Sequence, residues 1–330
     1  MASRPNAFHP GDVLFTPPEA ATATAKTLQY RQEHRGEGVY LGIREIDRYL
    51  TPVLPDNLVT LLGRPGAGKT ALMMWWARRE AQRLFAGGDE KKVVVYATYE
   101  QSVETLMAFN VAADQGLPID RMSKGSLNAD EWENVMRSLT GAVSLPIMFI
   151  GHSEQRRQRR PRLTMTNLES TLAYLVDEMK LTPHMIFVDY LQRIPGEKYA
   201  GDRRMEVSEN LDRCKDAALA FGAPWAVGVQ ARREVENRTL PIPMLSDGQE
   251  TANIEQASDK VFSMVRPCNY RRDGEQFGSV TVKGKHQMLV TVVKQKDGPS
   301  NESAWINFDP AYNRLITAEP ATGGSVEWPQ

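Results

Sequence analysis

The stretch LVTLLGRPGAGKT (58–70) decides the fold class of this chain. Its second part matches the pattern G-x-x-x-x-G-K-[ST] and lies between an apolar run typical of a strand and a run typical of a helix (69–85). Glycines let such a loop bend around a phosphate, and the N–H groups that begin the helix point at the anion. We therefore expect a phosphate-binding loop in which Lys69 neutralises the terminal phosphates of a nucleotide and the Thr70 hydroxyl ligates Mg²⁺. The loop consists of Gly63, Arg64, Pro65, Gly66, Ala67, Gly68, Lys69 and Thr70.

Short apolar runs and helical stretches alternate along the rest of the chain. The further apolar runs lie at 92–99, 145–151, 184–191 and 223–230, and the further helical stretches lie at 102–115, 129–140, 166–180 and 205–221. This alternation predicts an α/β fold with a mostly parallel sheet and helices on both faces. The last apolar runs follow one another without helices, at 260–267, 279–285, 287–295 and 303–310. They predict a C-terminal antiparallel extension of the sheet.

Two acids at predicted strand ends complete the expected site. Asp189 ends the apolar run HMIFVD (184–189), where its carboxylate would lie beside the loop and help to hold Mg²⁺. Glu100 follows the strand-like run KVVVYATY (92–99), and there it can polarise a water for attack on the terminal phosphate. The alternative for Glu100 is an N-cap or first-turn acid of the next helix.

Length and composition exclude several classes of protein. The 330 residues are 41% hydrophobic and 25% charged, which argues against a disordered, collagen-like or coiled-coil chain. The net charge of −1 means that a nucleic-acid or membrane partner would need a local charged patch. Two cysteines supply no disulfide framework, and no apolar run approaches the ~18 residues of a membrane span. We expect a cytoplasmic protein that does not contact a membrane.

The sequence predicts one large domain with two flanking segments. Residues 1–39 are rich in Pro, Ala and Thr and are expected to form an arm with one helix. Residues 40–316 contain no convincing linker and are expected to form a single α/β domain, followed by a tail at 317–330. This organisation replaces the two domains that length alone would suggest.

Several strings in the chain follow the order of one family. They are GRPGAGKT (63–70), YEQS (99–102), DYLQ (189–192), Gln230 after a strand, SDGQETANIEQASD (246–259) and KQKDGP (294–299). With these strings, residues 40–316 resemble the RecA-type motor domain of DnaB-like replicative helicases. The resemblance implies a RecA-like P-loop NTPase core that binds ATP with Mg²⁺. It also implies a homo-oligomer, either a hexameric ring or an open helix, that acts on single-stranded DNA.

The resemblance also assigns roles by matching position. Glu100 would be the catalytic base, Asp189 the acid that organises Mg²⁺, and Gln230 the residue that senses the γ-phosphate and signals to the DNA-facing loop. Lys294 and Lys296 would reach the nucleotide of a neighbouring subunit. The family has Lys-x-Arg where this chain has Lys-Gln-Lys, as in RecA recombinases, and a lysine offers a point charge instead of a planar fork. An exposed alternation on an edge strand is the alternative for both lysines.

The expected DNA contacts depart from the family pattern. The family segment S-D-L-R-E-S-G reads SDGQETA (246–252) here, so Gln249 replaces the arginine. In a recombinase-like core, the loops after the fourth and fifth strands face the central channel of the oligomer. Here they carry Lys198, Arg203 and Arg204 in the first loop and Arg232, Arg233 and Arg238 in the second. The predicted DNA-binding residues are Arg203, Arg204, Arg232, Arg233, Gln249 and Glu250. Acids interleave with these bases, which leaves solvated loop charge as an open alternative.

Two further segments lie outside the family pattern. Where the family has an N-terminal helical domain that docks primase, this sequence has the arm, whose helix matches in position the linker helix that packs on the adjacent subunit. A free tail is the alternative. The second segment contains Arg156, Arg157, Arg159, Arg160 and Arg162, five arginines within seven residues. It indicates an anionic partner, such as a phosphate backbone or an acidic protein, or a solvated loop.

Three functions remain open on these observations. The first is an ATP-dependent DnaB-like helicase or translocase on single-stranded DNA. The second is a RecA-like ATPase that binds strands for recombination, which the Lys-Gln-Lys string favours. The third is a nucleotide-gated assembly platform for a protein partner, which Gln249 and the absence of the family's N-terminal domain favour.

Overall fold

The computed structural model describes residues 14–33, 38–155, 162–199, 201–250 and 253–316. The chain divides into two units, Met1–Gly38 and Val39–Gln330. In the first unit, helix α1 (Pro17–Glu33) has no buried residue. Within the described part of the chain, no helix is both long and apolar enough to cross a membrane.

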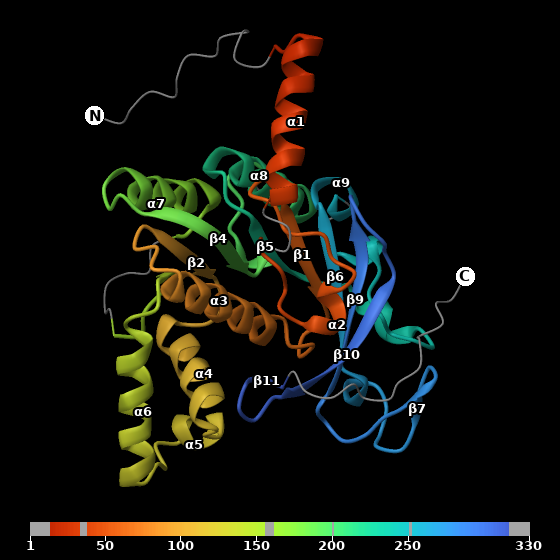
Figure 1. The fold of residues 1–330 in the computed structure, drawn as a ribbon. Helices are drawn as coiled ribbons and strands as arrows, with labels where there is room; N and C mark the ends of the chain where they lie inside the picture. Colours follow the sequence, from red (N-terminus) through yellow and green to blue (C-terminus); the bar gives the residue numbers. More distant parts are fainter. Residues whose placement is uncertain (1–13, 34–37, 156–161, 200, 251–252, 317–330) are drawn as a thin grey trace. The chain divides into compact units, whose positions relative to one another are not determined.

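Nine strands in the described part of the chain form one sheet, in the order β11–β10–β9–β6–β1–β5–β4–β2–β3 (Figure 1). The strands are β1 (Leu58–Gly63), β2 (Lys92–Thr98), β3 (Ile147–Ile150), β4 (Thr182–Asp189), β5 (Trp225–Gln230), β6 (Lys260–Val265), β9 (Gln287–Gln295), β10 (Glu302–Asp309) and β11 (Arg314–Ile316). From β6 to β3 all neighbouring strands are parallel. The pairs β6–β9, β9–β10 and β10–β11 are antiparallel. The predicted fold class is confirmed.

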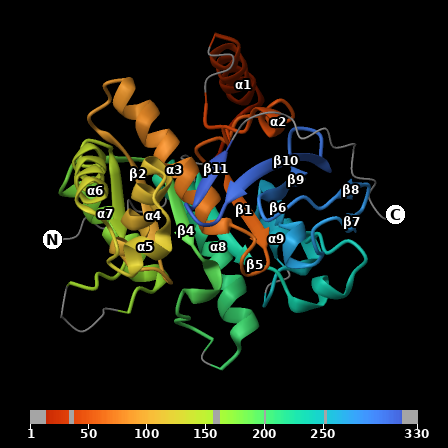
Figure 2. The same cartoon turned by 90° about the horizontal axis from the view of Figure 1, so that it is seen from below.

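Two details of the predicted antiparallel extension are wrong. The run 260–267 forms β6, which pairs in parallel with β1 and is antiparallel only to β9. Between β5 and β6 the chain returns to the start of the sheet with only short helices, so no long helical pattern announces a parallel crossover. The run 279–285 contributes only β8 (Val280–Thr281), which pairs with β7 (Gln276–Phe277) in a separate hairpin (Figure 2).

Helices cover both faces of the sheet because its parallel strands are apolar on both sides. The α-helices in the described part of the second unit are α2 (Arg44–Asp47), α3 (Lys69–Ala86), α4 (Val103–Gln115), α5 (Ile119–Ser123), α6 (Ala129–Ala142), α7 (Met165–Asp177), α8 (Arg203–Phe221) and α9 (Ile254–Ala257). On one face, the ring of Trp76 in α3 meets the ring of Phe187 in β4 edge to face, with centroids 5.6 Å apart. On the other face, Leu172 of α7 and Leu211 of α8 share a core with Val95 of β2.

Helices α4, α5 and α6 form a small group of their own (Figure 1). Val111, Leu117 and Val135 make its core. The group begins where β2 ends, so it continues the chain that carries Glu100. It therefore extends from the edge of the sheet at which the phosphate-binding loop also begins.

Candidate functional site

The phosphate-binding loop connects β1 to α3. All residues of β1 are buried, and the strand ends at Gly63. Gly66 and Gly68 have φ angles of +76° and +94°, a region that residues with a Cβ rarely adopt. Gly68 is the N-cap of α3, and Lys69 is its first residue. The loop thus presents the beginning of an 18-residue helix to a ligand, as anion binding requires.

Gly63 leaves little room for a side chain. A Cβ there would lie 3.0 Å from Ala67 Cβ and 3.2 Å from the carbonyl oxygen of Met264. We expect Gly63→Ala to displace the loop, to lower stability by about 1–3 kcal/mol and to weaken ATP binding. The measurement is thermal unfolding with and without ATP.

The matched control for this substitution is Gly141→Ala, because Gly141 has open space around its position and lies within helix α6. The control should unfold at or slightly above the wild-type temperature and keep its stabilisation by ATP. Equal behaviour of the two variants would mean that the packing at Gly63 does not shape the loop.

Lys69 is held inside the loop. Its Nζ donates hydrogen bonds to the carbonyl oxygens of Gly63 (2.7 Å) and Arg64 (3.2 Å). Burial lowers the pKa of Lys69 to about 8, although the carboxylates of Asp189 and Glu100 act in the opposite direction. The partners of this amine are loop carbonyls, so phosphate oxygens would be stronger, charged acceptors for it.

Asp189 lies at the end of β4 and is almost completely buried. Tyr96 donates a hydrogen bond from its hydroxyl to Asp189 Oδ2 (2.9 Å), and the Thr70 hydroxyl is also hydrogen-bonded to Asp189. Burial raises the pKa of Asp189, while these hydrogen bonds and Lys69 favour its ionised form. The sequence pattern gave no reason to single out Tyr96, whose hydroxyl reaches the acid from the neighbouring strand.

Glu100 lies two residues beyond β2, whose last residue Thr98 is in register with Asp189. Its carboxylate is about half exposed, and Oε1 lies 4.0 Å from Arg193 Nη2. The positions that the alternative interpretation gave to Glu100 belong to other residues. Ser102 is the N-cap of α4, accepting a hydrogen bond from Thr105 N–H, and Glu104 is the acid of its first turn.

Most of the predicted nucleotide-binding residues line one cavity of about 350 Å³. These are Pro65, Gly66, Gly68, Lys69, Thr70, Glu100, Asp189 and Gln230. Gln230 ends β5 in register with Gly63. Arg64 points elsewhere, to Glu236 (2.6 Å) and the carbonyl of Ala231 (2.8 Å). Parallel strands bring these side chains together because their carboxyl ends share one edge of the sheet.

Other residues of this cavity could not be found from the sequence. Arg266, Phe308, Pro310 and Asn313 also line it. Arg266 follows β6, Phe308 lies near the end of β10, and Pro310 and Asn313 lie in the turn between β10 and β11. Arg266 lies over the ring of Phe308, with its guanidinium carbon 5.1 Å from the ring centroid. No motif marks these positions, and only the folding of the antiparallel extension beside the loop brings them there.

Lys294 and Lys296 lie near the end of the central strands opposite to the phosphate-binding loop, where β1 and β6 begin. Lys296 Nζ is 2.5 Å from Asp259 Oδ1, and Asp259 Oδ2 accepts a hydrogen bond from the N–H of Leu58, the first residue of β1. Lys294 donates hydrogen bonds to the carbonyls of Glu255 and Ser258. Since β1 separates this end from the loop by about 17 Å, neither lysine can reach the cavity of its own chain.

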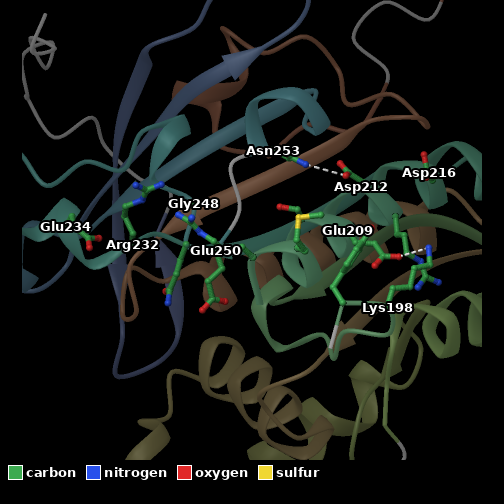
Figure 3. Close-up of a pocket in the computed structure, with 15 residues that line it drawn as sticks. Lys198, Glu209, Asp212, Asp216, Arg232, Glu234, Gly248, Glu250 and Asn253 are labelled. Atoms are coloured by element: carbon green, nitrogen blue, oxygen red, sulfur yellow. Dashed lines mark hydrogen bonds and ion pairs between the residues drawn. The ribbon is translucent and has the colours of Figure 1, made fainter. Parts of the chain in front are cut away.

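A second hollow, which we call the groove, has a volume of about 830 Å³ and lies between α8 and the segment after β5 (Figure 3). Arg204, Arg232, Gln249 and Glu250 line it together with Lys198, Tyr199, Met205, Ser208, Glu209, Asp212, Arg213, Asp216, Glu234, Gly248 and Asn253. Figure 3 shows Arg232, Gly248 and Glu250 on one side and Glu209, Asp212 and Asp216 on the other. The groove carries charges of both signs.

The six predicted DNA-binding residues differ in their surroundings. Arg204, Arg232, Gln249 and Glu250 line the groove, and the Arg233 side chain is 88% exposed. Arg203 is paired within the chain, with Nη1 2.8 Å from Glu206 and Nε 3.3 Å from Glu250. Arg203 and Arg204 begin α8 instead of lying in the loop before it, because the Asp202 side chain caps this helix by accepting a hydrogen bond from Met205 N–H.

Two other arginines of the predicted basic segments are placed differently. Arg238 forms two hydrogen bonds, of 2.6 and 2.7 Å, to the buried carboxylate of Asp247. This pair fixes the segment that leads to Gln249, so Arg238 is occupied within the chain. Of the arginine-rich stretch, residues 156–161 lie outside the described residues. Arg162, which follows them, donates a hydrogen bond to the carbonyl of Gly196 (2.9 Å).

Comparisons with known proteins agree with the fold. The family model "DnaB-like helicase C terminal domain" matches residues 38–317. The chain is 26% identical over 283 residues to the replicative DNA helicase DnaB of Geobacillus stearothermophilus, and the aligned region covers 86% of this chain and 57% of that relative. It is 27% identical over 299 residues to the replicative DNA helicase DnaC of Bacillus subtilis, which covers 90% of this chain and 60% of that relative.

The chain therefore spans less than two thirds of the curated relatives it matches. Among solved structures, that of a DnaB-like replicative helicase has the same fold, with a TM-score of 0.72 at 20% identity. That similarity covers 92% of this chain and 67% of the other. Since the family model matches most of its length, the chain belongs to the family of DnaB-like helicase C-terminal domains.

Proposed function

We propose that this chain is a Mg²⁺-dependent ATPase, the motor of a DnaB-like helicase that moves along single-stranded DNA as a ring or helical oligomer. One observation carries the proposal. A single cavity at the carboxyl edge of the parallel strands is lined by Lys69, Thr70, Glu100 and Asp189. Kinship with replicative helicases supports the same function and a cytoplasmic location.

The residues of the cavity suit ATP and Mg²⁺. The loop N–H groups and Lys69 would bind the phosphates, and Thr70 and Asp189 would hold the metal ion. Their fit is supported by the hydrogen bond between the Thr70 hydroxyl and the buried Asp189 carboxylate. When bound, Mg²⁺ neutralises charge on the transferred phosphoryl group. Glu100, whose half-exposed carboxylate borders the cavity, would accept the proton of the attacking water.

The positions of Lys294 and Lys296, at the end of the strands opposite to the loop, support an active site that two subunits share. Because these lysines cannot reach their own cavity, a contact with ATP requires a second copy of the chain. Lys296 is the better candidate, since its side chain is 51% exposed while it pairs with Asp259. Lys294 is engaged by two carbonyls of its own chain. The proposed oligomer therefore places Lys296 of one copy at the nucleotide of the next.

The DNA route is proposed along the groove and the segment after β5. Arg204 and Arg232 offer charge for phosphates, and Arg233 is exposed beside them. Gln249 and Glu250 would contact the strand from the segment where the family pattern has its nucleic-acid residues. Arg203 is assigned an internal role instead, because its guanidinium already bridges Glu206 and Glu250.

A nucleotide-gated assembly platform is the second candidate, and one observation favours it. Glu209, Asp212 and Asp216 line the α8 side of the groove, where they would repel a phosphate backbone. Unwinding of a forked duplex with ATP would support the helicase. Strand pairing without unwinding would support the recombination ATPase. ATP turnover that ignores single-stranded DNA but responds to a protein partner would support the platform.

We expect the affinity for single-stranded DNA to fall steeply with salt, with a slope magnitude of about 0.7 per phosphate contact. The double variant Arg204→Ala/Arg232→Ala should flatten that slope by roughly one unit or more and weaken all sequences alike, because contacts to the DNA backbone carry no base information. Fluorescence titration of oligonucleotides at several salt concentrations measures both effects.

The control is Arg137→Ala/Arg272→Ala, which removes two exposed arginines that do not line the groove. It should bind DNA as the wild type does. A further comparison replaces the five arginines at positions 156–162 by alanine, because that stretch is proposed to bind an anionic partner. Loss of binding there, with wild-type binding by the groove variant, would move the DNA route to the arginine-rich stretch.

A further inference from the structure

One side chain contacts both the nucleotide site and the groove. Gln192 lies in the 3₁₀ turn η2 (Leu191–Arg193), just after Asp189. Its Oε1 accepts a hydrogen bond from Gln230 N–H (3.1 Å), and its Nε2 donates to the carbonyls of Gln249 (2.9 Å) and Gln230 (3.4 Å). A single amide therefore joins the end of β5 to the segment around Gln249, which lies beside it.

The two residues that Gln192 joins belong to different sites. Gln230 lines the nucleotide cavity, and Gln249 lines the groove. One direct bond also connects them, from Gln249 N–H to the carbonyl of Gln230 (2.8 Å). Gln192 adds contacts from a third element that is anchored beside Asp189. Gln230 and Gln249 are thus connected directly through the backbone and also through the Gln192 side chain.

The main chain of Gln192 belongs to the same network. The Arg203 guanidinium donates to the carbonyl of Gln192 and also contacts Glu206 and Glu250. Because Arg203 is the first residue of α8, it connects the turn after β4 to this helix and to Glu250, which lines the groove. The contacts of Gln192 thus join the turn after β4 to the end of β5, to Gln249 and to the start of α8.

We infer that Gln192 is the positioning residue that couples nucleotide binding to ligand binding in the groove. The inference rests on the proposed function, in which ATP fills the cavity and single-stranded DNA fills the groove. Gln192 touches neither ligand. It acts because a glutamine amide can donate and accept at once, and here it does so to two backbone segments that face different sites.

The test compares the wild type with Gln192→Met, which keeps the length and volume of the side chain but removes its hydrogen bonds. The affinity for a fluorescent oligothymidylate is measured with and without a non-hydrolysable ATP analogue, and the ratio of the two affinities is the coupling. A wild-type ratio within the usual range of about 5–150-fold should fall several-fold toward one in the variant, in which the backbone bond between Gln230 and Gln249 remains. The affinity for the analogue, with and without DNA, must change by the same factor because the coupling is reciprocal.

Gln276→Met is the matched control, since it makes the same chemical change at an exposed position in the hairpin strand β7. It should keep the wild-type ratio. The inference is supported if Gln192→Met binds each ligand separately with wild-type affinity while the ratio of the two DNA affinities falls toward one. A merely structural defect would instead weaken the binding of each ligand on its own.

Other results contradict the inference in distinguishable ways. If the wild type couples the two ligands and Gln192→Met couples them equally well, the inference is wrong and the proposed function stands. If the wild type binds both ligands without coupling, the inference is also wrong, because there is no effect to transmit. If the wild type binds no oligonucleotide at low salt, the proposed DNA function fails, and the inference fails with it. If Gln192→Met does not fold, Gln192→Leu is measured in its place by the same criterion.

Discussion

Glu100→Gln is expected to reduce ATP turnover by about 10²–10⁴-fold while ATP still binds. The substitution keeps the size and hydrogen-bonding reach of the side chain but removes its ability to accept a proton from the attacking water. The phosphates would still meet Lys69 and the loop N–H groups, which do not involve Glu100. Lys69→Ala should behave differently, weakening nucleotide binding itself, because it removes the charge that faces the phosphates.

The measurements are single-turnover hydrolysis and equilibrium binding of a fluorescent ATP analogue. Glu104→Gln is the control, because Glu104 is the first-turn acid of α4 and does not line the cavity. It should hydrolyse ATP at close to the wild-type rate. Normal turnover in Glu100→Gln would assign the base to another residue and leave Glu100 with a structural role.

Lys296→Ala is expected to reduce turnover by at least about tenfold if this lysine completes the site of a neighbouring copy, as a cation supplied in trans does in other phosphoryl-transfer enzymes. Mixed with Lys69→Ala, it should regain activity. In a randomly mixed closed ring at equal ratio, roughly a quarter of the junctions join an intact lysine to an intact loop. The readout is the ATPase rate across mixing ratios, with co-assembly checked by particle mass.

Lys92→Ala is the matched control for Lys296→Ala. The Lys92 side chain is 49% exposed and pairs with Asp89 at 3.1 Å, much as Lys296 pairs with Asp259. It should keep full activity alone. The loss of Lys296 leaves Lys215 at 2.7 Å from Asp259, so the buried carboxylate keeps a cation. No recovery at any ratio in verified mixed assemblies would contradict a shared site.

The part of the site that the sequence predicted depends on short-range features. A glycine-rich loop between a strand and a helix is recognisable locally, and Asp189, Glu100 and Gln230 stand at the ends of apolar runs. Because parallel strands end at a common edge, these positions determine that the side chains come together. The sheet and most helices follow from the same periodic signals, including α3, predicted over 69–85 and observed over Lys69–Ala86.

The tertiary structure alone decided which charges face a ligand and which face the protein. Arg203 and Arg204 are neighbours in the sequence, yet Arg203 bridges Glu206 and Glu250 while Arg204 lines the groove. Arg238 is likewise taken up by the buried Asp247. A charge pattern cannot separate these cases, since each depends on an acid that the fold brings near.

By itself, the sequence determined the phosphate-binding loop, the alternation of strands and helices, and the strand-end acids. Only the tertiary structure decided that β6 runs parallel to β1, that Phe308 and Asn313 join the nucleotide cavity, and that Gln192 links Gln230 to Gln249. The physical reason is the range of the interactions. Loop bending and helix periodicity act over a few residues, whereas these arrangements depend on strand pairing and amide contacts between segments that are distant in the chain.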